Sequence, residues 1–296
     1  MGKILRPLWK IITAPFRFVA WIFRTIAGWF KNIGGDIYAL LNEEPEDEPL
    51  PETFAKTVEN PSAIFEHLNA LRKHLTRSVL VLILAVAFSF VFARQIIDIL
   101  AQPIGGIDAL IAIDPTEPIS VFMRVSLLTG FAIALPYIAL EIWLFIAPGL
   151  HTSSRHFSLA ALPFATLFFI GGMAFAYFII LPNGLPFLIN FMGMRTELRP
   201  SSYIRFVTAI MFWMGLAFQF PLIIYIIARI GLIDASTLAK QWRLAIVIIA
   251  IAAALITPTI DPVNMALVMG PLILLYFFSI FLAKTAERGR RRMETE

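Results

Sequence analysis

Two strongly polar side chains lie inside long apolar stretches of this sequence, and they are the first candidates for chemistry. Glu141 lies seven residues before Pro148, and Gln219 lies within the segment GLAFQFPL. A hydrocarbon environment penalises such groups by several kcal/mol unless they are paired or wetted. At 1.5 Å per residue Glu141 is on the order of 10 Å inside the helix end, and no basic residue is expected at its depth. Glu141 is therefore a candidate binding residue, whereas Gln219 fits an interhelical hydrogen bond and a ligand-facing role equally well.

The histidines are weaker candidates for metal or proton chemistry. They lie at the edges of apolar stretches, without an evident carboxylate or thiolate to complete a metal site, at His67, His74, His151 and His156. The chain contains no cysteine and lacks the motifs G-x-x-x-x-G-K-S/T, H-E-x-x-H and G-x-S-x-G. We therefore expect no metal, no other cofactor and no enzymatic activity.

Membrane-spanning helices must position these residues, because the chain is 59% hydrophobic, only 15% charged and has a mean hydropathy of +0.80. A soluble chain is about half apolar and a quarter charged. A helix needs roughly 20 residues to cross a ~30 Å hydrocarbon core, so the long gaps between charged residues predict six spans in an all-α integral membrane protein. The fifth of them is short. The expected spans are about 77–97, 122–147, 157–181, 204–230, 242–258 and 263–283.

Prolines within or beside these spans are expected to shape the helices. Pro136, Pro163 and Pro221 each remove an i to i−4 hydrogen bond and should bend their helix. Pro148, followed by glycine, should bend and end the second span. Bent helices would form a curved wall with grooves instead of a straight bundle.

The distribution of Lys and Arg predicts how the spans are oriented. With the N-terminus inside, the inner segments hold most of the 24 basic residues, and basic loops stay on the cytoplasmic side. Both termini are therefore expected in the cytosol, and Asp261 is expected in an outer loop between the fifth and sixth spans. The net charge of +4 fits attraction to anionic lipid more simply than nucleic-acid binding.

The segment before the first span divides into two parts. In residues 1–42, cations recur every seven positions beside an apolar surface, at Lys3, Lys10, Arg17, Arg24 and Lys31. This pattern predicts an interfacial amphipathic helix on the membrane, with a cytosolic helix packed on another protein as the alternative. Residues 43–60 include the acidic, proline-rich EEPEDEPLPE and predict an extended linker. The membrane domain then covers 61–284, and residues 285–296 form a basic cytosolic tail.

Five colinear segments carry a resemblance to a known family. Between Phe65 and Ile280 they are HLNALRKHL, TEPISVFMRVSLLTGFAIALPYIALEIWLFIAPGL, GMAFAYFIILP, YIRFVTAIMFWMGLAFQFPLIIYIIARIGLI and ITPTIDPVNMALVMGPLILLY. In this order they resemble TatC, the polytopic subunit of the twin-arginine protein translocase. Residues 1–60 fall outside the family core and form an extension.

The resemblance implies six transmembrane helices arranged as a concave, glove-like receptor for the paired arginines of a signal peptide. It also implies a place in the cytoplasmic membrane, single-span TatA- and TatB-type partners in homo- and hetero-oligomers, and transport of folded proteins driven by the proton motive force. The residues that match family motifs are His67, Leu68, Leu71 and Arg72 before the first span, Phe145 and Pro148 at the end of the second, Arg155 in the following loop, Gln219 in the fourth span, and Asp261.

The chain departs from the family at the point of recognition. The family's signal-binding glutamates fall here on Ala70 and Ser154, which cannot supply the carboxylates that paired guanidinium groups prefer. We hypothesise that Glu66, one helical turn before Ala70, and Glu141 compensate. The alternative is a divergent family member with weakened signal recognition that acts in assembly or on fewer cargo proteins. Phe277, where many relatives place glutamate, is a third departure.

Two other classes of function fit the residues less well. A small-solute secondary transporter would place charged or broken-helix sites at the bilayer midplane within internal repeats, and only Gln219 qualifies while no repeat is visible. An intramembrane enzyme would need a nucleophile with a base, or metal ligands, within a span, and the sequence contains neither pattern. We therefore expect a translocase subunit.

Overall fold

The computed structural model describes Gly35, Ile37, residues 61–149, Arg155, and residues 158–190, 197–257 and 261–295. The interfacial helix expected at 1–42 and the linker expected at 43–60 thus lie outside the described residues, apart from Gly35 and Ile37. Within the described part every regular element is a helix, and the one extended contact is an isolated bridge between Leu110 and Leu198. The prediction of an all-α protein is confirmed.

Four helical segments among the described residues are long and apolar enough to cross a membrane: Glu117–Ile146, Ser158–Ile189, Pro200–Ile230 and Pro262–Gly289. A bent pair, His67–Ser89 with Ala93–Ile104, gives a fifth candidate if its halves are taken as one span. The helix Trp242–Ile256 is apolar but has only 15 residues. These six regions coincide with the six expected spans, and the number of bilayer crossings stays a prediction.

The first expected span is broken in the structure. Helix α3 (Pro61–Ser89) runs from the residues before the expected span into the span itself, and α4 (Ala93–Ala101) follows it at an angle of 73°. The span expected at about 77–97 therefore includes this break, and its bounds stay a prediction. At the break the N–H groups of Val91 and Phe92 donate to carbonyls three residues back, at 3.2 and 3.1 Å, as in a turn.

The amphipathic sequence of α4 explains why it does not continue the span. Its polar side chains Arg94, Gln95 and Asp98 are exposed. Its other face contacts the core through Ala93, Ile97, Leu100 and Ala101. A helix with one polar and one apolar stripe lies along a core rather than through hydrocarbon.

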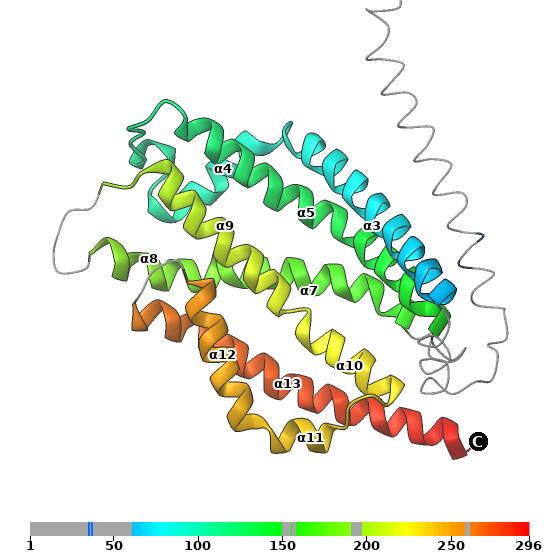
Figure 1. Ribbon diagram of the computed structural model, residues 1–296. Coiled ribbons are helices and arrows are strands. Elements are labelled where there is room, and N and C mark those ends of the chain that lie inside the picture. The colour runs from blue at the N-terminus through cyan, green and yellow to red at the C-terminus, as the bar shows by residue number, and fades with distance from the viewer. Residues whose placement is uncertain are drawn as a thin grey trace, which may run out of the picture.

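Helix α5 (Glu117–Ile146) packs against α3 and, elsewhere on its surface, against α7 (Leu162–Phe175) and α9 (Pro200–Ala217) (Figure 1). A Cβ added at Gly130 would lie 2.6 Å from Val86 Cα, so α3 and α5 approach too closely there for any larger residue. The helix runs through Pro136 without ending. It ends before the 3₁₀ turn η3 (Ala147–Gly149), which contains Pro148.

The third expected span is longer than its predicted end at residue 181. Helix α7 continues through a π-helical turn, η4 (Ala176–Ile180), into α8 (Leu181–Ile189). A Cβ at Gly172 would lie 2.5 Å from the Met214 carbonyl oxygen, so this glycine allows α7 and α9 to touch through their backbones. The apolar helical segment therefore reaches Ile189.

The fourth expected span contains a short interruption. Helix α9 ends at Ala217, and α10 (Phe220–Ile230) begins after a turn at Phe218 and Gln219. Pro221 lies in the first turn of α10, where its missing N–H costs no helical hydrogen bond. The proline thus coincides with the start of a new helical segment.

The C-terminal helices differ greatly in length. The short helix α11 (Ala235–Lys240) precedes α12 (Trp242–Ile256), and α13 (Pro262–Thr295) has 34 residues. At 1.5 Å per residue α12 is only about 22 Å long, less than the ~30 Å of a bilayer core, whereas α13 reaches about 50 Å. The residues expected as a basic cytosolic tail at 285–296 continue α13 as far as Thr295. Helix α13 packs against α10 and α12.

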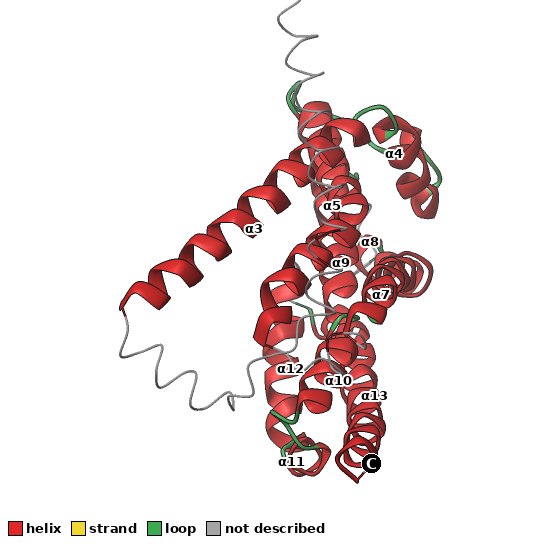
Figure 2. Ribbon diagram, turned by 90° about the vertical axis from the view of Figure 1, so that its right-hand side faces the viewer, coloured by secondary structure: helices red, strands yellow, loops and turns green. Residues whose placement is uncertain are grey.

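Three apolar clusters hold the described helices together, and the third joins α10, α11 and α13 at Ile224, Ala228, Ala235 and Ala283. The largest joins α4, α5, η4, α8, α9, α12 and α13, and its bulkiest fully buried side chains include Ile180, Leu181, Ile204, Ile210 and Met214. The second lies near the end of α5, at Tyr137, Trp143, Leu144 and Ala147, with Val81 of α3 packed on it. Figure 2 shows α3 leaning away from α10, α12 and α13 toward its N-terminal end, so the helices do not form a parallel bundle.

Candidate functional site

The Glu141 carboxylate is fully buried and is held by side chains from two helices. Tyr137 Oη donates to Oε1 at 2.5 Å, and His74 Nδ1 lies 2.6 Å from Oε2. Arg77 Nη1 lies 3.9 Å from Oε1, which is too long for a hydrogen bond but close enough for an ionic interaction. We call His74, Arg77, Tyr137 and Glu141 the Glu141 cluster.

The expectation that no basic residue lies at the depth of Glu141 is wrong. Tyr137 and Glu141 are four residues apart on α5, so they share one face, and His74 and Arg77 are three residues apart on α3 and share another. The close approach of the two helices at Gly130 brings these faces together. His74 and Glu141 are 67 positions apart in the chain, so no local sequence pattern predicts their contact.

Aromatic and apolar side chains surround the Glu141 cluster on the side of the α3 N-terminus. The ring of Phe145, one turn after Glu141, lies 4.7 Å from the His67 ring and 6.1 Å from the His74 ring, measured between centroids. His67 and Arg72 are exposed on α3, and its exposed apolar side chains there are Phe65, Leu68, Leu71 and Leu75. The side chain of Glu66 lies outside the described residues.

Arg155 forms hydrogen bonds with residues near the end of α5. Its side chain is buried, and its Nη2 donates to the Pro148 carbonyl at 3.3 Å. The Arg155 carbonyl accepts from Ser158 Oγ at 3.1 Å, and Ser158 Oγ accepts from Trp143 Nε1 at 2.8 Å. Arg155 therefore fastens the chain after η3 to the end of α5. Ser154 lies outside the described residues.

Gln219 and Asp261 lie on other elements. Gln219 Nε2 donates to the Ala165 carbonyl of α7 at 2.7 Å, so the structure contains the interhelical hydrogen bond that was one of the two interpretations of this residue. Asp261 precedes α13 and accepts from the Asn264 backbone N–H at 2.7 Å and from Asn264 Nδ2 at 3.0 Å. Asp261 thus caps the N-terminus of α13. Of the predicted site residues, the structure brings together His67, Glu141 and Phe145.

A second buried carboxylate, at the other end of α5, was not identified from the sequence. Arg199, just before α9, donates from Nε to Glu117 Oε1 at 2.9 Å, and its Nη2 bonds the same oxygen. The pair ties the start of α5 to the start of α9. Nearby, Asp114 accepts from the Thr116 hydroxyl at 2.7 Å and from its backbone N–H at 2.8 Å, and these hydrogen bonds lower the pKa of Asp114. The 82 positions between Glu117 and Arg199 left no sequence signal for the pair.

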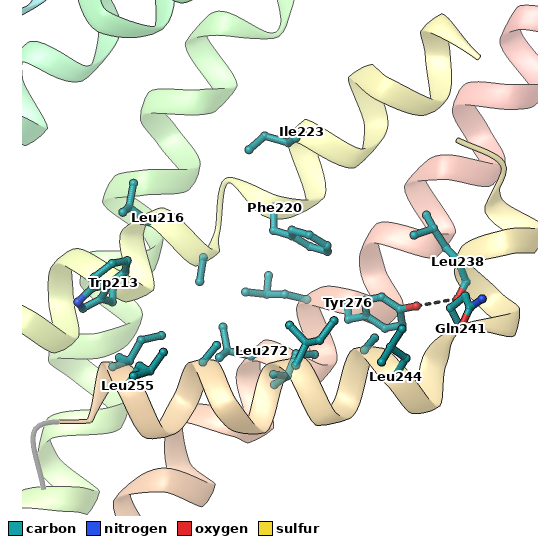
Figure 3. Close-up of a pocket in the computed structure, with 17 residues that line it drawn as sticks. Trp213, Leu216, Phe220, Ile223, Leu238, Gln241, Leu244, Leu255, Leu272 and Tyr276 are labelled. Carbon is teal, nitrogen blue, oxygen red and sulfur yellow. Dashed lines mark hydrogen bonds between the residues drawn. The ribbon is translucent and has the colours of Figure 1, made fainter. Parts of the chain in front are cut away.

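An apolar groove of about 620 Å³ lies between α9, α10, α12 and α13 (Figure 3). The side chains that Figure 3 labels in it include Trp213, Phe220, Leu244, Leu255 and Leu272. Its polar members are Gln241 and Tyr276, and the Tyr276 hydroxyl donates to the Leu238 carbonyl at 2.6 Å. The lining is therefore suited to a hydrocarbon chain or an apolar helix rather than to a polar solute.

Comparisons with known proteins place these features in a family. The family model described as Sec-independent protein translocase protein (TatC) matches residues 66–271. The Carboxydothermus hydrogenoformans protein of that name is 32% identical over 229 residues, which cover 76% of this chain and 94% of the relative. The Aquifex aeolicus protein is 34% identical over 237 residues, 77% of this chain and 98% of the relative. A crystal structure of a twin arginine translocase receptor TatC is similar with a TM-score of 0.64 and 34% identity, over 74% of this chain and 99% of that one.

Proposed function

This chain belongs to the TatC family of Sec-independent protein translocase proteins, and we propose on that premise that it binds twin-arginine signal peptides and helps to move folded proteins across the cytoplasmic membrane. It is a multi-pass membrane protein. The proposal includes six crossings with both termini in the cytosol, and the proton motive force as the driving force. The excess of basic residues in the inner segments supports this orientation.

The observation that carries the proposal is the surface formed by the first half of α3 and the end of α5. It combines exposed apolar side chains of α3 with the exposed His67, the half-buried Phe145 and, beneath them, the Glu141 carboxylate. A signal peptide presents arginines next to apolar residues. A carboxylate beside apolar and aromatic side chains complements that pattern, because guanidinium groups bind carboxylates and stack on rings.

The test is export of a folded reporter by this chain alone. The full-length chain would replace the TatC-family subunit of a host strain, and the reporter would carry either a twin-arginine or a twin-lysine signal. We expect export of the twin-arginine reporter only. Equal export of both reporters, or none with the chain inserted in the membrane at normal level, would contradict receptor function.

The alternative, a family member with weakened signal recognition, is favoured by Ala70 and by Ser154, which replace the family's acids. It predicts that the chain still assembles with a partner subunit although the twin-arginine reporter is not exported. Co-purification with the host's single-span subunits in the same strain separates the two. Assembly without export would favour the weakened member.

For the single-span partner we propose the apolar groove as the binding site. The groove follows the short helix α12, and its lining matches the side chains of a transmembrane helix. Because the chain has no cysteine, Leu244→Cys can be cross-linked to a single cysteine in the partner helix without background. Leu167→Cys, on an exposed face of α7, is the matched control and should not cross-link.

A further inference from the structure

We propose that Glu141 Oε2 accepts an arginine of the bound signal peptide, and that His74 is the resident partner that this arginine displaces. The inference rests on the proposed function and deepens it by naming the atom that recognises the guanidinium. It gives the Glu141 cluster two states: a closed state with His74 on Oε2, and a bound state with the peptide's arginine in that place.

The first argument is the supply of carboxylates at this surface. Among the described side chains of α3 and of the C-terminal half of α5, Glu141 is the only carboxylate. Ala70 lies one turn before His74 on α3, and its methyl group accepts no hydrogen bond. An arginine that enters between the start of α3 and the end of α5 can therefore meet Glu141 as an anionic partner, in addition to Glu66 earlier on α3.

The second argument is that the two oxygens of the Glu141 carboxylate have different numbers of partners. Oε1 accepts the Tyr137 hydroxyl and faces Arg77. Oε2 is bonded by His74 alone among the described residues. His74 can therefore leave without removing either partner of Oε1, and the carboxylate keeps a hydrogen bond and a nearby cation throughout the exchange.

The third argument is the path from solvent to Oε2. The side chain of His74 is 18% exposed, against 1% for Glu141, so the histidine is the member of the pair that reaches solvent. Its ring contacts Phe145, which also contacts the exposed His67. A rotation of His74 about its side-chain bonds opens Oε2 toward the surface of α3 without a backbone shift.

The fourth argument is the relative strength of the two partners. Imidazole makes one hydrogen bond to Oε2. A guanidinium group is always charged and has five donors in a planar fork, so it adds a full positive charge and can make more than one hydrogen bond to the carboxylate. An arginine can therefore replace the histidine, whereas the ammonium of lysine lacks the planar fork that gives bidentate geometry.

The experiment measures binding of synthetic twin-arginine and twin-lysine signal peptides to the full chain in lipid nanodiscs. We expect Glu141→Gln to weaken twin-arginine binding at least about tenfold and to abolish the preference over twin-lysine, because the anionic acceptor is lost. His74→Ala should strengthen twin-arginine binding, because Oε2 is no longer occupied. His74→Arg should weaken it, because a resident guanidinium closes the site. Glu197→Gln, an exposed acid on a distant segment, is the control and should bind as the unchanged protein does.

The opposite effects expected of the two His74 variants separate recognition from folding. If Glu141 were only structural, both His74→Ala and Glu141→Gln would lower binding together with the unfolding midpoint, which would overturn the inference. An unaltered preference in Glu141→Gln would also overturn it while leaving the receptor function intact. Failure of the unchanged protein to prefer twin-arginine over twin-lysine would instead contradict the proposed function itself.

Discussion

Helix α5 carries a buried glutamate near each end, and the two are held by different kinds of partner. Glu117, in the first turn, is paired with the Arg199 guanidinium. Glu141 lies 24 residues later, about 36 Å along the helix axis, and is bonded by a histidine and a tyrosine with Arg77 farther away. The Arg199 guanidinium stays charged at any physiological pH, whereas the imidazole of His74 makes one bond that a stronger donor can replace. The first pair therefore closes a helix junction, and the second is suited to exchange.

The largest loss of stability is expected from Glu141→Leu, which removes the carboxylate of the Glu141 cluster. The change removes the carboxylate that bonds the largely buried His74 and faces Arg77, and breaking a buried ion pair costs about 3–5 kcal/mol. The thermal unfolding midpoint of the purified protein in detergent measures it. Glu141→Gln keeps the size of the side chain and a hydrogen-bond acceptor for Tyr137, so this variant should lose less stability than Glu141→Leu. A Leu variant as stable as the unchanged protein would show that the cluster does not stabilise the fold.

A smaller effect is expected from Gly130→Ala, which disturbs the helix contact that assembles the Glu141 cluster but not the Glu117 pair. The added Cβ would meet Val86 Cα at 2.6 Å, so α3 and α5 must move apart, at a cost of about 1–3 kcal/mol. Gly171→Ala is the matched control, since no atom lies within 4 Å of its Cβ, and it should stabilise slightly by helix propensity. Equal unfolding midpoints for the two variants would contradict the close approach.

Breaking the ion pair between Glu117 and Arg199 should destabilise the protein less, since the Arg199 side chain is half-exposed. Arg199→Ala leaves the buried Glu117 carboxylate without its cation and should destabilise the protein by about 1–2 kcal/mol. The double variant Arg199→Ala with Glu117→Gln should recover part of the loss, because no buried charge remains. Unfolding midpoints of the two variants measure the difference. Added loss in the double variant would show that Glu117 is stabilised by something other than Arg199.

The smallest effect is expected at Asp114, beside the Glu117 pair. Hydrogen bonds from Thr116 lower its pKa in the folded protein, so its contribution to stability is present above the ordinary pKa of about 3.9. It is lost as the pH falls through the lower folded value. Asp114→Asn should therefore reduce the unfolding midpoint slightly at pH 6, and the difference should vanish near pH 2. A difference that persists in acid would assign the effect to another interaction.

Much of the architecture was predictable because it follows from local patterns. Charge-free stretches located all six apolar regions, and the shortness of α12 was expected from its composition. The break after Ser89 could have been found from the two-faced pattern of α4, which was read as part of a uniform span. The extension of α13 to Thr295 was missed for a different reason. Charged residues end a span, but they do not end a helix.

The candidate site was only partly predictable. Glu141, Phe145 and His67 were singled out by type and position, and the structure places them on one surface. From the sequence, His74 was expected only at the edge of an apolar stretch, and Arg77 was not singled out. Their part in the Glu141 cluster depends on which face of α3 meets α5, and a sequence of apolar residues on all sides of a helix does not specify that face.

The sequence by itself determined that this is an all-helical membrane protein of the TatC family, because hydropathy and the order of motifs can be read along the chain without knowing how the helices pack. Only the tertiary structure decided which charges neutralise each other inside it. A buried carboxylate takes as its partner whichever cation the helix crossings bring within reach, and these crossings are set by contacts such as Gly130 on Val86. For Glu117 that cation is Arg199, and for Glu141 it is Arg77, while His74 and Tyr137 are hydrogen-bonded to the same carboxylate.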